Sequence, residues 1–109
     1  MLFNKTKNKL ITDEIIHCSS FISKATGLMF SSKKNLLFEF NSEQKEPLHM
    51  FFVFYSINVL FLDKDKNIVE IKKKLSPFTM YFPKAKAKYV IELSKDYLDY
   101  YAVGDQLEF

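Results

Sequence analysis

The 109-residue sequence contains no arginine and no tryptophan, and it has one cysteine, two glycines and three prolines. Because a single cysteine cannot form an intrachain disulfide, we exclude a disulfide-stapled fold and expect a reducing, cytoplasmic environment. Without arginine the chain lacks the side chain best suited to bidentate recognition of phosphate or guanine. The sixteen lysines are offset by thirteen acidic residues, leaving a net charge of +3, so no nucleic-acid partner is expected.

Uninterrupted apolar segments of membrane-spanning length are also absent. The most apolar stretch, LHMFFVFYSINVLFLD (48–63), has sixteen residues and is interrupted by His49, Ser56, Asn58 and Asp63. A membrane span needs about twenty apolar residues. The first residues lack the apolar core of a signal peptide. The sequence therefore predicts a soluble protein in which 48–63 forms part of the core.

Aromatic residues are abundant instead, with twelve Phe and six Tyr. Such side chains suit half-buried pleated surfaces, so we expect a mainly β protein with one or two short helices (α+β). The length suffices for one hydrophobic core. We expect a compact single domain over 10–109, resembling a β-sandwich, a jelly roll or a barrel. The Lys- and Asn-rich residues 1–9 are expected to be frayed.

Local patterns predict the individual elements. Strands are expected in 10–18 (one strand or two short ones), 36–40, 48–55, 56–63, 68–74 and 84–93, with a final strand after a Gly-Asp turn at 104–105. Residues 48–55 are apolar on both faces, which predicts a strand covered on both sides. Residues 84–93 alternate between a core face and a mostly solvated one. A short helix is expected between Ser19–Ser20 and Gly27, and a helical turn in 94–101.

Several segments resemble one family in order and spacing: GLMF (27–30), LLFEF (36–40), HMFFVF (49–54), INVLFLD (57–63), YVIEL (89–93) and GD (104–105). They resemble domain of unknown function 192, also called uncharacterised protein family 0127, from about residue 10 onward. The resemblance implies a compact, mostly β fold of the sandwich or jelly-roll type. It implies no established activity. The structural motif residues it gives are Gly27, Leu28, Met29, Phe30, Gly104 and Asp105.

The sequence departs from the family pattern at four positions. The family usually has an acidic residue at Asn58, a proline at Ser56 and an arginine at Ser31, and its better-known branch has Trp at His49. An amide forms hydrogen bonds but does not exchange a proton near neutral pH. The departure at Asn58 therefore weakens an enzymatic interpretation.

Polar residues that interrupt apolar strands are the candidate ligand-binding groups: His49, Asn58, Asp63, Glu92 and Tyr81. His49 has three interpretations, namely a hydrogen-bonded core residue, a pocket group or a metal ligand, and one imidazole alone makes no metal site. His17 and Cys18 are adjacent, so on a strand they point to opposite faces and cannot share an ion.

Two further patterns have structural explanations. The DKDKN segment matches the first ligand positions of a calcium loop, but Ile68 and Lys74 replace the required Gly and Glu, so we expect a hairpin tip. The Lys84, Lys86 and Lys88 stripe is interpreted as a solvated strand face.

No catalytic residues, cofactor or metal are predicted from these patterns. We expect a binding module for a small molecule or saccharide, in a cleft near His49, Asn58 and the aromatic 78–82 connection. A protein-interaction component and a hydrolase using His49 with Asp63 or Glu92 are the alternatives. Either a monomer or a homodimer is compatible with the sequence.

Overall fold

The computed structural model describes residues 1–18, 35–45, 47–49, 56–77, 79–94 and 97–109. Within these ranges the elements are β1 (Leu2–Asn4), β2 (Lys9–Thr12), β3 (Ile16–Cys18), β4 (Leu36–Gln44), β5 (Leu48–His49), β6 (Ile57–Leu62), β7 (Ile68–Leu75), β8 (Met80–Tyr81), β9 (Ala87–Leu93), the 3-10 turn η1 (Leu98–Tyr100) and β10 (Leu107–Glu108). The prediction of a mainly β protein is confirmed. The helix expected before Gly27 lies outside the described residues.

Three sheets organise the described strands. The central sheet has five strands in the order β3-β4-β9-β6-β7, flanked by a three-stranded sheet β10-β1-β2 and a two-stranded sheet β5-β8. Strands β3 and β4 run parallel, whereas the other neighbours in the central sheet are antiparallel. Because β3 and β7 are its two edges, the central sheet is not a closed barrel.

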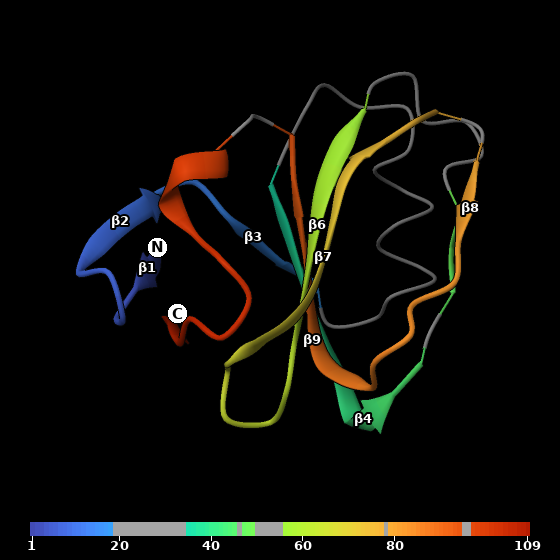
Figure 1. The fold of residues 1–109 in the computed structure, drawn as a ribbon, viewed down its shortest axis with the longest axis horizontal. Helices are drawn as coiled ribbons and strands as arrows, with labels where there is room; N and C mark the ends of the chain where they lie inside the picture. The colour runs from blue at the N-terminus through green and yellow to red at the C-terminus, as the bar shows by residue number, and fades with distance from the viewer. Residues whose placement is uncertain (19–34, 46, 50–55, 78, 95–96) are drawn as a thin grey trace.

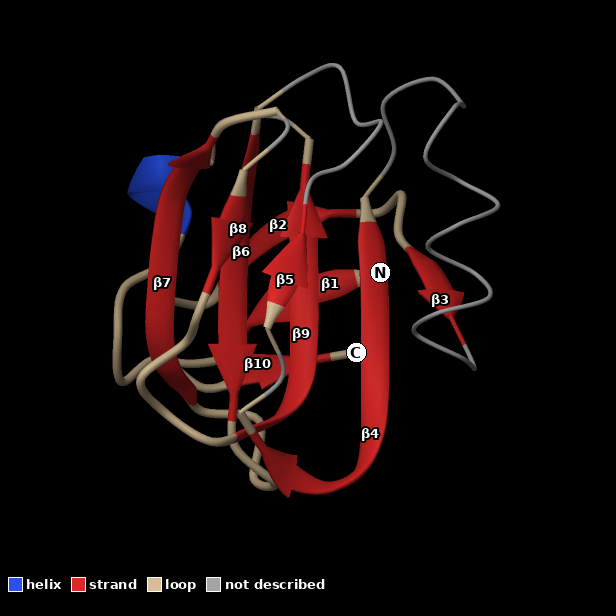
Figure 2. Cartoon of the chain, turned by 90° about the vertical axis from the view of Figure 1, so that its right-hand side faces the viewer, coloured by secondary structure: helices blue, strands red, loops and turns tan. Residues whose placement is uncertain are grey.

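The sheets are arranged as layers. In Figure 1 the central sheet is seen nearly edge-on, with β1, β2 and β10 on one side and β5 and β8 on the other. Figure 2, turned by 90°, shows the central strands side by side with the short β5 and β8 in front of them. A layered arrangement covers both faces of the middle sheet.

Two apolar clusters fill the spaces beside the central sheet. The first, cluster A, lies toward β5 and β8 and contains Leu36, Phe38, Phe40, Leu48, Ile57, Val59, Phe61, Leu75, Ala87 and Val90. The second, cluster B, lies toward β1, β2 and β10 and contains Leu2, Ile11, Leu37, Leu60, Leu62, Ile68, Tyr89, Ile91, Leu93, Tyr101 and Leu107. Burying each large apolar side chain contributes about 1.5–3 kcal/mol, so both clusters stabilise the layers.

Strand β6 explains the apolar run of 57–62. All six of its residues are buried, because β6 lies between β9 and β7 with a cluster on each face. Val59 and Phe61 belong to cluster A, whereas Leu60 and Leu62 belong to cluster B. A strand buried on both faces shows continuous rather than alternating hydrophobicity.

Strand β9 differs from its prediction. The face expected to be mostly solvated includes Val90, which is 1% exposed, and Glu92, which is only partly exposed. The reason is that β9 lies between β4 and β6 at the centre of the sheet. On that face only Lys84 and Lys86, which precede the strand, are exposed.

The two ends of the chain are held in the three-stranded sheet. Residues 1–9 were expected to be frayed, but Leu2–Asn4 form β1 between β2 and β10, and Leu2 is fully buried. The expected final strand is present as β10, and the helical turn in 94–101 is present as η1. Strand β4 continues to Gln44, further than the predicted boundary at residue 40.

Candidate functional site

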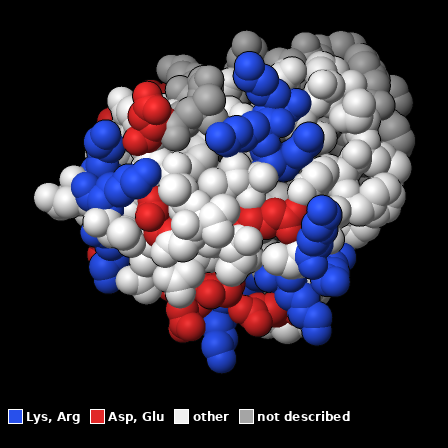
Figure 3. Space-filling model, viewed as in Figure 1, with Lys and Arg blue, Asp and Glu red and all other residues white. Residues whose placement is uncertain are grey.

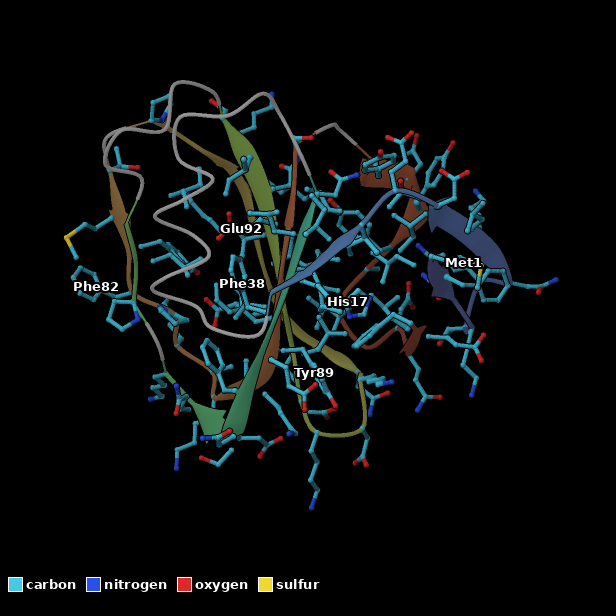
Figure 4. All side chains as sticks on the ribbon, turned by 180° about the vertical axis from the view of Figure 1, so that it is seen from behind. Met1, His17, Phe38, Phe82, Tyr89 and Glu92 are labelled. Atoms are coloured by element: carbon cyan, nitrogen blue, oxygen red, sulfur yellow. The ribbon has the colours of Figure 1, made fainter. Side chains whose placement is uncertain are left out.

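The sequence-derived candidates do not converge on one site in the described structure. Glu92 lies in β9 on the cluster A face, where its neighbours across the sheet are Leu36 and Val59. Figure 4 shows Glu92 and Phe38 on the same side of the central sheet. Burial raises the pKa of the Glu92 carboxyl to about 7, because its apolar surroundings disfavour the charged form.

Tyr81 lies on the same face but is engaged in a structural network. Its hydroxyl donates to Glu70 Oε2, and its ring is 5.8 Å from that of Phe61. Glu70 Oε1 accepts from the backbone N–H groups of Lys84 and Ala85, both at 2.8 Å. Burial, followed by the hydrogen bond and the charge of Glu70, raises the pKa of Tyr81 to about 12. This network fixes the connection between β8 and β9.

Asn58 faces the opposite side of the sheet. It pairs with Leu93 of cluster B, and its Oδ1 accepts a hydrogen bond of 2.9 Å from the backbone N–H of Lys74. The register between β6 and β7 is irregular at this point, between Ile57 and Val59. Lys74 also has a positive φ of 52°. The Asn58 amide therefore supports an irregular strand pairing.

Asp63 stabilises the tip of the β6–β7 hairpin. Its Oδ1 accepts from the backbone N–H groups of Asp65 and Asn67, each at 2.9 Å. Side chains of this type commonly close turns in this way. Val59 pairs with Glu92, and Asp63 follows the end of β6, four residues beyond Val59, which separates it from Glu92 by about 13 Å along the strand direction. Asp63 and Glu92 therefore do not form a carboxylate pair.

The remaining candidates lie elsewhere. His49 is in β5 opposite Met80 of β8, and residues 27–30 lie outside the described residues. Gly104 has a φ of 96°, and the adjacent Asp105 is buried. Asp105 Oδ2 accepts from Asn4 Nδ2 and from the backbone N–H of Ala102, both at 2.9 Å. The turn at 104–105 is therefore hydrogen-bonded to β1.

A cleft lies on the cluster B side, away from those candidates. Its volume is about 540 Å³, and it is lined by His17, Leu37, Glu39, Phe40, Asn41, Lys66, Lys88, Tyr89 and Phe109. Strand pairing brings several of these residues together, since His17 lies opposite Leu37 and Glu39 lies opposite Tyr89. Figure 4 shows His17 and Tyr89 on the other side of the sheet from Phe38 and Glu92. The cleft and the partly buried Glu92 are therefore on different faces.

Aromatic rings form one wall of this cleft. The Tyr89 and Phe109 rings meet edge to face with centroids 5.1 Å apart, and the His17 ring lies 6.5 Å from that of Phe109. Tyr89 is well buried in cluster B, whereas His17 is exposed and Phe109 is partly exposed. The wall is thus anchored in the core and open on its outer side.

Two ammonium groups border the same rings. Lys66 Nζ is 4.2 Å from the centroid of Phe109 and 5.8 Å from that of Tyr89, and Lys88 Nζ is 5.5 Å from that of Tyr89. Lys88 Nζ also lies 3.2 Å from Glu39 Oε2 and donates to the carbonyl of Phe40. Lys66 Nζ in turn donates to the main-chain oxygen of Phe109 at 3.4 Å.

The patterns in the sequence do not predict this cleft. The alternation in 84–93 predicts a core position for Tyr89 and a solvated one for Lys88, and the only feature of His17 in the sequence is its position next to Cys18. The cleft joins residues from β3, β4, the β6–β7 turn, β9 and the segment after β10. The available signal was the abundance of aromatic residues, which does not specify which rings meet.

The surface charge is mixed. On the face shown in Figure 3, lysines of the described residues are interspersed with Asp and Glu side chains. Within the described part of the chain, no group of three or more His, Cys, Asp or Glu side chains could hold a metal ion. None of the helical segments in that part is both long and apolar enough to cross a membrane.

The fold and the cleft define a small, mainly β domain built from layered mixed sheets. The chain belongs to the DUF192 family, described as "Uncharacterized ACR", whose model matches residues 2–109. This confirms the resemblance seen in its sequence motifs. A UPF0127 protein of Thermococcus sibiricus is 36% identical over 115 residues, covering 100% of this chain and 74% of that relative. A UPF0127 protein of Pyrococcus horikoshii is 36% identical over 95 residues, covering 84% and 82%.

Two crystal structures have a similar fold. A protein of unknown function from Novosphingobium aromaticivorans matches with a TM-score of 0.75 and 17% identity, covering 87% of this chain and 74% of that chain. A Sinorhizobium meliloti protein, described as a proposed transcription regulator, matches with a TM-score of 0.80 and 20% identity, covering 98% and 88%. At these identities the likeness concerns the fold alone.

Proposed function

We propose that this chain is a small-molecule binding module and that its ligand site is the cleft bordered by His17, Lys66, Tyr89 and Phe109. The observation that supports this proposal most is the cleft itself, whose volume of about 540 Å³ falls within the range of roughly 300–1,000 Å³ typical of ligand pockets. It combines an aromatic wall with a few polar groups, the usual composition of such sites.

The site expected from the sequence, near His49, Asn58 and the aromatic 78–82 connection, has weaker support. Asn58 Oδ1 receives the Lys74 N–H, and the Tyr81 hydroxyl donates to Glu70. Asp63 is engaged by its own turn. A polar group that already satisfies buried backbone or side-chain partners gains less from a ligand, because binding must first break those bonds.

A fragment screen by protein-observed NMR tests this proposal. We expect hits that perturb the amide resonances of Glu39, Asn41 and Tyr89, and we expect His17→Ala to weaken them because it removes part of the aromatic wall. His17 is exposed, so this change should leave the fold intact. As a control, Asp99→Ala changes an exposed residue that does not line the cleft. Hits confined to other surfaces, or no hits at all, would refute the assignment.

Self-association is a second candidate function, favoured by two exposed apolar side chains. Met80 in β8 is 47% exposed and Phe82 just beyond it is 65% exposed. Contiguous exposed apolar surface often marks contact sites, and these two side chains are only two positions apart in the sequence. Sedimentation velocity over a range of concentrations should show a dimer that Phe82→Ser weakens. A monomer at every concentration would remove this candidate.

A further inference from the structure

We infer that the outer edge of strand β7 binds an extended acidic segment of a partner protein, which joins the central sheet as an additional strand. This surface is separate from the cleft, because none of the residues that line the cleft belongs to β7. The inference is carried by a strand edge that no described strand covers and by three successive lysines along it.

Strand β7 is one end of the five-stranded sheet. Its beginning is covered, because the backbone of Ile68 is hydrogen-bonded to those of Gly104 and Asp105, both at 2.8 Å. Beyond Ile68, no backbone–backbone hydrogen bond joins the outer edge of β7 to the described residues. On the inner side, 70–72 pair with β6 in regular register. Residues 69–75 therefore present a strand edge with unpaired N–H and C=O groups.

The other sheet edges in the described part of the chain are shorter. Strand β3, at the opposite end of the central sheet, has three residues, and the edges β2 and β10 of the three-stranded sheet have four and two. Strand β7 has eight. Main-chain hydrogen bonds provide the affinity when a peptide adds to a sheet, so a longer edge binds an added strand better. Of these edges, β7 is the best suited to receive a partner.

The charge of this edge selects the kind of partner. Lys73 and Lys74 are exposed and Lys72 is partly exposed, and none of the three forms a salt bridge with a carboxylate of the described residues. Glu70, the one acidic residue of β7, already accepts the Tyr81 hydroxyl and two backbone N–H groups before β9. Figure 3, drawn in the view of Figure 1, shows lysines gathered over the region of β7. An acidic strand would place carboxylates beside these lysines.

A second copy of this chain fits the edge less well. Two β7 edges paired side by side would bring the lysines of both copies together, and like charges across a strand pair are destabilising. Lysines on edge strands commonly prevent self-association in this way. The same charges attract a segment rich in Asp or Glu, so an acidic partner is the occupant that this edge favours.

Titration of the intact chain with short peptides tests this inference. The probe is a peptide of alternating Glu and Val, as long as segment 69–75 and blocked at both ends, followed by NMR through the amide resonances of Val69, Ile71 and Lys73. We expect it to shift these resonances, whereas the same peptide with Lys in place of Glu should not. A version N-methylated at every residue keeps the charge but has no N–H donors, so it should bind more weakly by about tenfold or more.

Variants of the chain test the charge requirement. The double variant Lys72→Gln/Lys73→Gln should weaken binding of the acidic peptide by roughly three- to tenfold, because two exposed ion pairs are lost. Lys73→Gln alone, at an exposed position, should give part of this loss even if the double variant folds poorly. The matched control is Lys45→Gln, since Lys45 is exposed but follows β4, which β9 and β6 separate from β7 in the sheet.

Four outcomes would overturn the inference. Equal binding of the N-methylated peptide would mean that charge alone attracts the probe, and equal losses from Lys73→Gln and Lys45→Gln would mean that the attraction is not specific to β7. A dimer that the double variant strengthens and that excludes the peptide would mean that a second copy occupies the edge. No shift at Val69, Ile71 or Lys73 would also refute the inference, and it would leave the cleft proposal standing, because the fragment screen reports on other residues.

Discussion

Glu92 and Val59 lie side by side on β9 and β6, so a carboxyl group stands next to a fully buried valine on the cluster A face. A carboxyl in such a position is stabilised in its protonated form, and the pKa of Glu92 is correspondingly raised to about 7. The group therefore links the stability of the fold to pH.

We expect Glu92→Gln to stabilise the protein at pH 8 but to have little effect at pH 4.5. The pKa of Glu92 in the unfolded chain is close to 4.5. Its contribution to stability is therefore fully present below that pH and is lost as the pH rises through about 7. The gain at pH 8 should be on the order of 1–3 kcal/mol, since one pKa unit corresponds to about 1.4 kcal/mol and partial exposure reduces the effect.

Urea unfolding of the wild type and Glu92→Gln at both pH values measures this difference. Glu39→Gln serves as the control, because its side chain is largely exposed and its removal should not produce a pH-dependent gain of this size. An equal stability difference at pH 4.5 and pH 8 would mean that Glu92 does not titrate between them.

The Asn4–Asp105 contact predicts a strong dependence of stability on Asp105. Asp105→Ala would remove the acceptor of the Ala102 N–H and one of the two acceptors of the buried Asn4 Nδ2, which also donates to the Tyr100 carbonyl. Unsatisfied buried donors cost about 1–3 kcal/mol each, so we expect a loss of roughly 2–4 kcal/mol in the free energy of unfolding. Chemical denaturation checks this value against Asp99→Ala, an exposed acidic residue nearby in sequence. Similar losses for both variants would argue against a special role for the contact.

Glu70 and Tyr81 should contribute unequally to stability. Glu70→Ala removes the acceptor for the Tyr81 hydroxyl and for the N–H groups of Lys84 and Ala85, whereas Tyr81→Phe removes only the first bond. We expect losses of about 2 kcal/mol and about 1 kcal/mol, respectively. Thermal denaturation of both variants gives the order. A reversed order would show that packing of the tyrosine hydroxyl, rather than the two backbone bonds, fixes the β8–β9 connection.

Substitution of Gly104 tests the cost of a positive φ alone, because an added side chain would not clash with neighbouring atoms. Its φ is 96°, and a Cβ added there would meet no atom within 4 Å. Gly104→Ala should therefore cost about 1 kcal/mol through conformation alone, and Gly104→Asn should cost less because asparagine tolerates positive φ better. Equilibrium unfolding of the two variants measures the difference. Equal stability of both variants and the wild type would mean that the turn relaxes.

Local patterns in the sequence predict where the strands lie better than they predict which strands pair with each other. The run INVLFL is apolar on both faces, and the structure buries β6 on both faces as expected. In β9 the same reasoning gave a wrong environment for Val90, because alternation with Lys84, Lys86 and Lys88 indicated a solvated face. Whether a strand is central or at an edge depends on pairing between distant segments, which a local pattern does not specify.

The candidate site was harder to predict for the same reason. Asn58 and Asp63 are polar interruptions of an apolar run. In the structure both side chains accept hydrogen bonds from backbone N–H groups. The cleft instead depends on Lys66 and Phe109, which approach each other only when the β6–β7 turn and the segment after β10 are both in place. A sequence contains these residues without indicating their separation in space.

The pairing of β1 with β10 has a consequence for how the chain folds. Asn4 and Asp105 are 101 positions apart, yet they are bonded directly, and β10 forms one side of the sheet that contains β1. Bringing such distant residues together costs loop-closure entropy, which the contacts between the two segments must offset. Strand β1 therefore completes its hydrogen bonding only when residues 107–108 are available, so the three-stranded sheet requires segments that are far apart in the sequence.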